Sequence, residues 1–175
     1  MKETSQVPLF VQRMDRFLDL LANTCRLMTG FALVFLTVIG GWLVFGRYVL
    51  NATPTWVEQC SLLLVMLIAF LGAAVGVHDH THLSVVMLRT AVPRVVRQML
   101  VVATDVVMAG FGGFMFWYGF QLTVFKWASP IPLLQLPEGL RSLPLTVGGA
   151  LIFFFSVGHL IRLAMGVDER RDNIE

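Results

Sequence analysis

The chain has 175 residues, of which 57% are hydrophobic and only 14% are charged, against roughly a quarter charged in a soluble domain. The formal net charge is +2 and the sequence has no basic tract, which argues against a nucleic-acid-binding protein. Length and composition together predict a single membrane domain, residues 1–175, without a soluble module.

The N-terminal segment, residues 1–26, is not expected to be a signal peptide, because acidic residues interrupt it and the first long apolar run starts only at Leu27. Its apolar residues recur at helical spacing, with Arg13, Arg16 and Asp19 largely on the other side. The pattern predicts an amphipathic helix that lies on the membrane surface or extends the first span.

Four later stretches are long enough to cross a hydrocarbon core of ~30 Å, which takes about 20 helical residues. Between the second and third stretches, apolar residues alternate with arginines, which predicts a short interfacial helix over residues 80–92. Four prolines exclude one continuous helix through the segment 126–144, so residues 126–142 are predicted to form a loop. We therefore predict an all-α membrane protein with four transmembrane helices, at about residues 27–46, 56–77, 98–125 and 143–163.

The Lys and Arg residues are distributed unequally between the two sides of this topology. Ten of the 13 lie in the N-terminal flank, the 78–98 segment or the C-terminal flank, and three lie on the other side. Because cytoplasmic loops carry the excess of positive charge, both termini are predicted to be cytoplasmic.

The second span has polar residues at both mouths. Trp56 and Glu58 open it, and Glu58 could pair with Arg47 across the short loop or each could reach the headgroups separately. Either way, Arg47, Trp56 and Glu58 are interpreted as periplasmic anchors and not as catalytic groups.

A cluster of histidines closes the second span at its cytoplasmic helix end. His78, Asp79, His80 and His82 resemble metal ligands, but no further cysteine or carboxylate cluster accompanies them, so we expect no metal site. His78 and His159 on facing helices could instead hold a b-type haem, which keeps a four-span electron-transfer protein as an alternative. Such ligands usually come from inside a span, whereas His78 lies at its very end, so no cofactor is expected.

Two cysteines and one acid remain to be assigned. Cys25 and Cys60 lie near opposite mouths of their spans, nearly a membrane thickness apart, so they cannot form a disulfide within one chain.

Asp105 is the intramembrane acid of the sequence, and an acid there is a candidate for a proton relay. It lacks a second membrane acid, so a structural pair with an arginine on the same side is favoured.

Small residues form stripes on two of the predicted spans. Gly72, Ala73 and Gly76 lie on one side of the second span, and Gly112 and Gly113 mark the third. Small side chains let helix backbones approach closely, so these residues are predicted to pack against other helices, within the chain or in a partner protein.

The order of these motifs resembles that of a known family. Trp56 and Glu58 open the second span as W-x-E, F-L-G-A-A follows at residues 70–74, and H-L-S-V follows at residues 82–85. A Pro-rich loop then precedes L-P-L-T-V-G-G-A-L at residues 143–151. In this combination the chain resembles the small membrane subunit of TRAP (tripartite ATP-independent periplasmic) transporters.

The resemblance implies a non-catalytic subunit in a bacterial inner membrane. Its partners would be a large multi-span subunit that carries the sodium-driven transport path, a periplasmic binding protein that captures an organic acid, and membrane lipid. The small subunit would broaden the scaffold of the large one and help dock the binding protein. We expect spans one and two to face the large subunit, and the loops 47–56 and 126–142 to face the binding protein. A small homo-oligomeric transporter that works alone, with Asp105 essential, is the other alternative.

Overall fold

The structure, a computed structural model, describes residues 9–51, 55–79, 94–131 and 136–164. It contains four long helices, each long and apolar enough to cross a membrane, which confirms the predicted all-α fold with four transmembrane helices. Their bounds are α1 Leu9–Tyr48, α2 Thr55–His78, α4 Arg94–Phe125 and α5 Gly139–Ala164. The interfacial helix predicted over residues 80–92, and His82 within it, lie outside the described residues.

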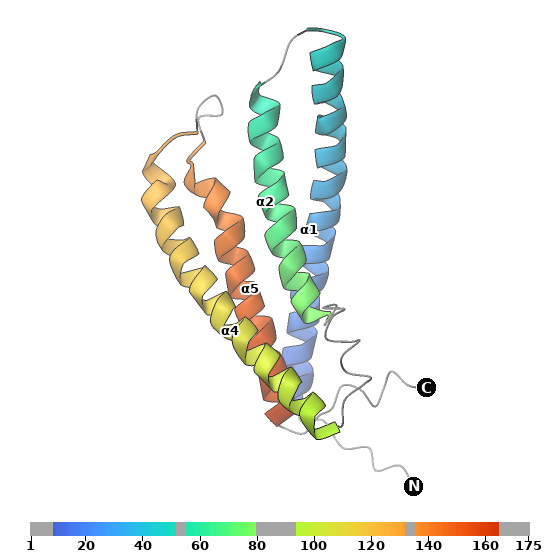
Figure 1. Cartoon of the computed structure of the whole chain (residues 1–175), viewed down its shortest axis with the longest axis vertical. Coiled ribbons are helices and arrows are strands. Elements are labelled where there is room, and N and C mark those ends of the chain that lie inside the picture. Colours follow the sequence, from blue (N-terminus) through green and yellow to red (C-terminus); the bar gives the residue numbers. More distant parts are fainter. Residues whose placement is uncertain (1–8, 52–54, 80–93, 132–135, 165–175) are drawn as a thin grey trace, which may run out of the picture.

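The helices are arranged in the order α1, α2, α5, α4, so α1 and α4 lie at opposite sides of the bundle (Figure 1). Helix α5 packs against both α2 and α4 and contributes Leu151, Ile152 and Phe155 to the core. The core lies where α5 meets α2 and the first half of α1, because the buried residues of α1 in this cluster are Leu18, Ala22 and Cys25.

Helix α1 is one unbroken helix of 40 residues. At ~1.5 Å per residue it is about 60 Å long, roughly twice the thickness of a hydrocarbon core. The amphipathic N-terminal segment therefore continues the first span as a helical extension. Its buried side is narrow and repeats every seven residues, at Leu18, Cys25, Ala32 and Ile39.

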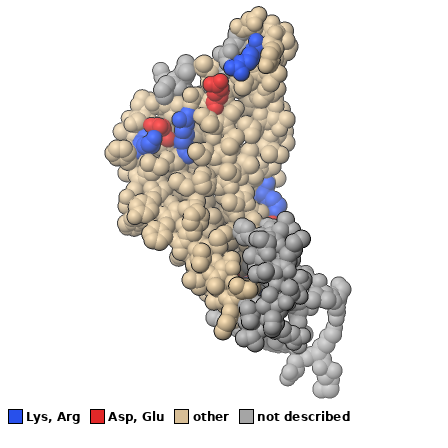
Figure 2. Space-filling model, viewed as in Figure 1, with Lys and Arg blue, Asp and Glu red and all other residues tan. Residues whose placement is uncertain are grey.

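Each helix contains an interval of 20 residues without Lys, Arg, Asp or Glu, namely residues 27–46, 59–78, 106–125 and 142–161. Twenty helical residues span about 30 Å, the thickness of a hydrocarbon core. We call the end that holds Arg26, Asp79, Asp105 and Arg162 the terminal edge, and the end that holds Arg47, Glu58, Lys126 and Arg141 the loop edge. On the face drawn in Figure 2, charged side chains gather at the upper end and again beside the grey residues, with an uncharged surface between them.

The Pro-rich segment after α4 is compact in the part that the structure describes. A short 3-10 helix, Lys126–Ala128, is followed by a bridge between Pro130 and Pro137. The N–H groups of Ile131 and Glu138 donate to the carbonyls of Leu136 and Ser129, both at 2.7 Å. Helix α5 begins at Gly139, four residues before the predicted start of the fourth span, so Pro144 lies inside the helix.

Candidate interaction site

The three residues predicted as anchors lie at the loop edge, at the end of α1 and the start of α2. Arg47, Trp56 and Glu58 are all exposed. Arg47 and Glu58 do not form an ion pair with each other in the described part of the chain, so the predicted bridge across the loop is not present there. The hairpin of α1 and α2 is therefore not tied at this edge by that pair.

Two other polar contacts stabilise the loop edge. The Arg141 guanidinium donates to the side-chain oxygen of Gln59, which joins the start of α5 to the start of α2. The Lys126 ammonium lies 2.9 Å from a Glu138 carboxylate oxygen and closes the Pro-rich loop. The hydrogen bond from Lys126, together with its charge, lowers the pKa of Glu138 below its ordinary value.

His78 lies in a network of charged side chains at the terminal edge. Its Nε2 is 3.2 Å from an Asp19 carboxylate oxygen and its Nδ1 is 3.3 Å from one of Asp79. Arg26 donates to both oxygens of Asp79, at 2.8 and 2.9 Å. The network joins the end of α2 to the extension of α1, because Asp19 and Arg26 both belong to α1.

Two opposing effects set the pKa of Asp79. Burial raises it, whereas the hydrogen bonds from His78 and Arg26 and the charge of Arg26 lower it, and the result is a pKa below the ordinary value. The ionised carboxylate is therefore the form that this network stabilises.

The geometry around His78 does not favour an axial haem ligand. Both of its ring nitrogens face carboxylates, and its ring packs edge-on against Phe155 with centroids 4.9 Å apart. The ring of His159 lies beside it, at a centroid distance of 6.2 Å. The described residues contain no group of three or more His, Cys, Asp or Glu side chains placed to hold a metal ion.

Asp105 is buried in α4 with only 5% of its surface exposed. Helices α4 and α5 are antiparallel, and Gly119 faces Thr146 while Gly112 faces Phe153. That register places Asp105 at the level of His159, near the terminal edge.

Cys25 and Cys60 are free thiols, as the predicted distance between them requires.

Glycines form a close contact between α4 and α5. A Cβ atom added at Gly112 would lie 2.7 Å from the backbone nitrogen of Phe153, and one at Gly149 would lie 2.6 Å from that of Phe116. The same atom at Gly113 would make only ordinary contact with the Phe153 ring, and at Gly72 it would meet nothing within 4 Å. Ala73 is exposed. The structure therefore brings Gly112 into a helix contact, whereas Gly72 has open space beside it and Ala73 is exposed.

Helix α5 has packing glycines that were not predicted from the sequence. Gly148 and Gly158 lie on α5, against Phe70 of α2 and Leu18 of α1, at Cβ distances of 2.8 and 2.6 Å. Gly148 and Gly149 form the G-G pair in the L-P-L-T-V-G-G-A-L segment, which was used only for the family resemblance. A test for small residues on the fourth span as well would have found them.

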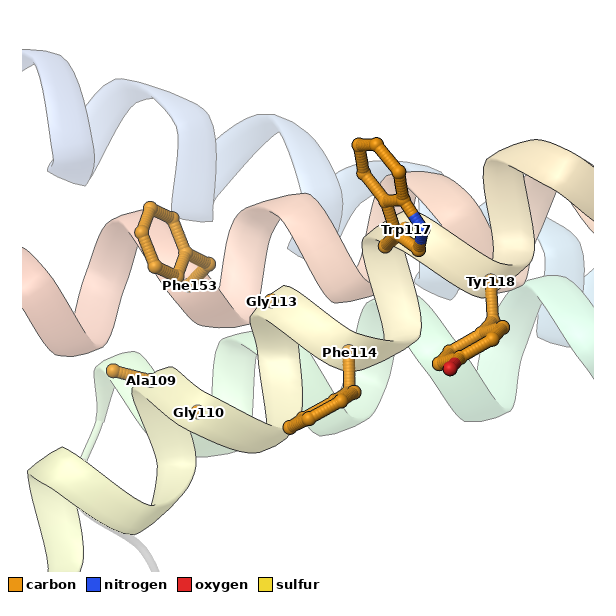
Figure 3. Close-up of a pocket in the computed structure, with 7 residues that line it drawn as sticks. All are labelled: Ala109, Gly110, Gly113, Phe114, Trp117, Tyr118 and Phe153. Carbon is orange, nitrogen blue, oxygen red and sulfur yellow. The ribbon is translucent and has the colours of Figure 1, made fainter.

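A shallow apolar groove lies along α4 where this helix borders α5. Figure 3 shows the rings of Phe114 and Tyr118 directed to one side of α4 and that of Trp117 to the other, with Gly113 between them. Phe153 of α5 completes the lining beside Ala109, Gly110 and Gly113. Within the part of the chain that the structure describes, the groove is a concave surface that could receive an apolar partner.

Comparisons with known proteins identify the family. Residues 36–166 match the family described as the DctQ component of tripartite ATP-independent periplasmic transporters. The chain is also 30% identical, over 132 residues, to a Haemophilus influenzae protein named as a TRAP transporter small permease protein; the match covers 74% of this chain and 76% of that protein. With four membrane-spanning helices and this match over most of its length, the chain belongs to the DctQ family, the small membrane subunits of TRAP transporters.

Proposed function

We propose that this chain is a non-catalytic scaffold subunit of a secondary-active, sodium-driven TRAP transporter for organic acids. The large membrane subunit carries the substrate and the sodium ions, and this chain supports it in the bacterial inner membrane. Both termini are cytoplasmic, so the terminal edge faces the cytoplasm and the loop edge faces the periplasm. There, Arg47, Trp56, Glu58 and the 126–142 loop help dock the binding protein.

The observation that carries the proposal is the distribution of charge along the helices. Lys, Arg, Asp and Glu are confined to the two edges and beyond, and none lies in the 20-residue intervals between them. Organic anions and their coupled ions are usually bound at mid-depth by charged side chains or by the ends of interrupted helices. The bundle offers helix contacts at that depth, which suits a support and not a transport path.

Reconstitution into liposomes tests the proposal. The tagged chain is purified alone and together with the large subunit, and the binding protein loaded with a C4-dicarboxylate or with sialic acid is supplied under a sodium gradient. We expect uptake only when both membrane subunits are present. Uptake by this chain alone would contradict the scaffold role and favour a small independent transporter.

A substitution at Asp105 further distinguishes a scaffold subunit from an independent small transporter. If the chain is a scaffold, Asp105→Asn lowers the amount of assembled complex, because it replaces a buried carboxyl group at the terminal edge, while uptake per assembled complex is retained. If the chain transports on its own, the same change abolishes its uptake. Complex yield after affinity purification and uptake normalised to that yield separate these outcomes.

A further inference from the structure

The groove on α4 lies near the middle of the membrane-spanning interval. Its α4 residues fall between Ala109 and Tyr118, inside the uncharged interval 106–125, and Phe153 of α5 borders it. Gly110 and Gly113 form its floor without side chains, and aromatic rings stand on both sides (Figure 3). A Cβ atom at Gly110 would meet nothing within 4 Å, so the floor is open to a neighbour. Such a floor allows the backbone of another helix to approach closely.

Polar groups are exposed on the same side of α4. Trp117 and Tyr118 are each 61% exposed, at about 12–14 Å from the level of Lys126 along the helix. Gln121, one turn further, is exposed as well and lies about 7 Å inside the loop edge. Within the part of the chain that the structure describes, the Trp117 indole N–H, the Tyr118 hydroxyl and the Gln121 amide make no hydrogen bond.

Lipid tails cannot supply the partners that these groups need. A hydroxyl or amide placed in hydrocarbon without a hydrogen bond costs several kcal/mol on transfer scales. Along the helix axis, the backbone of Tyr118 lies about 12 Å from the level of Lys126. A neighbouring helix with polar side chains at this depth would satisfy the three groups and fill the groove.

We propose that the outer face of α4, formed by Gly110, Gly113, Trp117, Tyr118 and Gln121, receives a transmembrane helix of the large TRAP subunit that carries hydrogen-bonding side chains near mid-membrane. This inference rests on the proposed function, because it takes the large subunit as the partner. It assigns the contact to α4, although the sequence alone favours spans one and two.

The outer face of α1 fits lipid better than it fits a polar helix. Its exposed side chains at mid-depth are apolar, including Phe31, Phe35 and Val38. The hydroxyl of Thr37 donates to the carbonyl of Leu33 at 2.9 Å in its own helix, so it needs no outside partner. At mid-depth the exposed face of α1 thus presents apolar side chains to lipid, and its exposed Trp42 lies only five residues from Arg47. The exposed face of α4 instead carries the polar groups of Trp117 and Tyr118 deeper in the interval.

A second copy of this chain fits the groove less well than a different helix does. In a parallel two-fold pair through α4, each residue near the axis meets its own copy at the same depth. Trp117 would then meet Trp117 and Phe114 would meet Phe114, and these rings would keep the glycine floors apart. A helix with small residues opposite Trp117 can approach the floor from the side between the aromatic rings.

Site-specific photo-cross-linking tests the proposal in the assembled complex. A benzoylphenylalanine replaces Phe114 beside the groove or, as the matched control, Phe35 on the outer face of α1. The yield of large subunit that copurifies is measured first, so failure of the proposed function would appear as absent complex with the parent chain. Given the complex, we expect the residue-114 probe to form an adduct with the large subunit and the residue-35 probe to form none. An adduct from residue 114 only with lipid or with a second copy of this chain would overturn the proposal.

Substitutions that fill the groove or remove its polar groups provide a second test, in which the yield of copurified large subunit is measured. Gly110→Leu fills the floor, where the chain itself leaves open space, and its control is Gly41→Leu on α1, which also has no atom within 4 Å of an added Cβ. We expect at least a tenfold loss of copurified large subunit for Gly110→Leu and no change for Gly41→Leu. The double variant Gln121→Leu, Tyr118→Phe approximately keeps the size of both side chains but removes the amide and the hydroxyl. We expect it to reduce the copurified large subunit about fivefold. Equal yields of copurified large subunit for the parent chain and the three variants would contradict the proposal, provided that each protein elutes as a folded monomer in detergent when expressed alone.

Discussion

The two outer helices of the bundle are attached to their neighbours in different ways. Helix α4 packs on α5 through glycines, so that the backbones of Gly112 and Gly149 touch the opposite helix directly. Helix α1 packs on α2 through a narrow stripe of residues. The α1 glycines do not take part in close contacts, because a Cβ atom added at Gly30, Gly40 or Gly41 would meet nothing within 4 Å. Instead, α1 is joined to α2 at the terminal edge by the network of Asp19, Arg26, His78 and Asp79.

The difference shows two solutions to one physical problem. Between helices in a membrane there is no hydrophobic force, because lipid tails are as apolar as the side chains. Helices then associate through close van der Waals contact, which requires small residues, or through polar groups, which are stable where water and headgroups are near. The α4–α5 pair uses the first solution along its length, and the α1–α2 pair uses the second at one end.

The largest expected effect comes from filling the glycine contact. Gly149→Leu would place side-chain atoms where the backbone of Phe116 lies, so α4 and α5 would have to separate. We expect a loss of about 3 kcal/mol or more in the free energy of unfolding, at the upper end of overpacking effects. Denaturant titration in detergent, followed by circular dichroism, measures it.

The matched control is Gly30→Leu on α1, where the added side chain meets open space. It should leave the free energy of unfolding unchanged or raise it slightly, because Leu favours helix more than Gly does. A similar loss at both positions would show that the two helix pairs do not differ in the way described.

A moderate effect is expected from breaking the charged network. Arg26→Gln removes the bidentate contact with Asp79, whose side chain is 34% exposed, while that of Arg26 is 54% exposed. Pairs this exposed contribute about 1 kcal/mol or less, so we expect a loss of that size in the free energy of unfolding. Exchanging the two residues, Arg26→Asp with Asp79→Arg, should recover part of the loss if the pair itself is responsible.

The same pair predicts how stability depends on pH. The pKa of Asp79 is lowered in the folded chain from its ordinary value of 3.8, so its contribution is complete above that pH and is lost as the pH falls through the lower, folded value. The contribution of this carboxylate should therefore be constant from neutral pH down to about 5 and should decline only below about 4. In Arg26→Gln the decline below pH 4 should be smaller than in the parent chain, and an equal decline would assign the acid sensitivity to other groups.

The fold could be predicted from the sequence because each span carries its own signal. Twenty apolar residues between charges define a membrane helix without reference to any other part of the chain, and residues 106–125 are an example. Gly112 could be named as a candidate packing residue because small side chains let helices approach closely, although the same reasoning also named Gly72. The match of residues 36–166 to the family confirms the resemblance that the motifs in spans two and four indicated.

The neighbours of each helix could not be predicted, because they depend on register and rotation. Gly72 and Gly112 look alike in sequence, yet an added Cβ meets open space at the first and the backbone of Phe153 at the second. The contact of His78 with Asp19 requires that α1 continue straight past the terminal edge, which the sequence left open between two alternatives. The groove likewise depends on how α4 is rotated against α5, because Phe153 of α5 completes its lining.

The smallest expected effect concerns a hydrogen bond inside the tight pair. The hydroxyls of Thr123 on α4 and Thr146 on α5 are buried and lie 3.1 Å apart, and each is also near a carbonyl of its own helix. Thr146→Val keeps the shape and removes this contact, so we expect a loss of about 0.6 kcal/mol in the free energy of unfolding, typical of interhelical hydrogen bonds in membranes. Thr37→Val on α1, whose hydroxyl bonds only to its own helix, is the control and should change the free energy of unfolding by less than Thr146→Val. If Thr146→Val instead cost as much as Gly149→Leu, the α4–α5 pair would depend on polar contacts as the α1–α2 pair does, and close packing would not be what distinguishes the two.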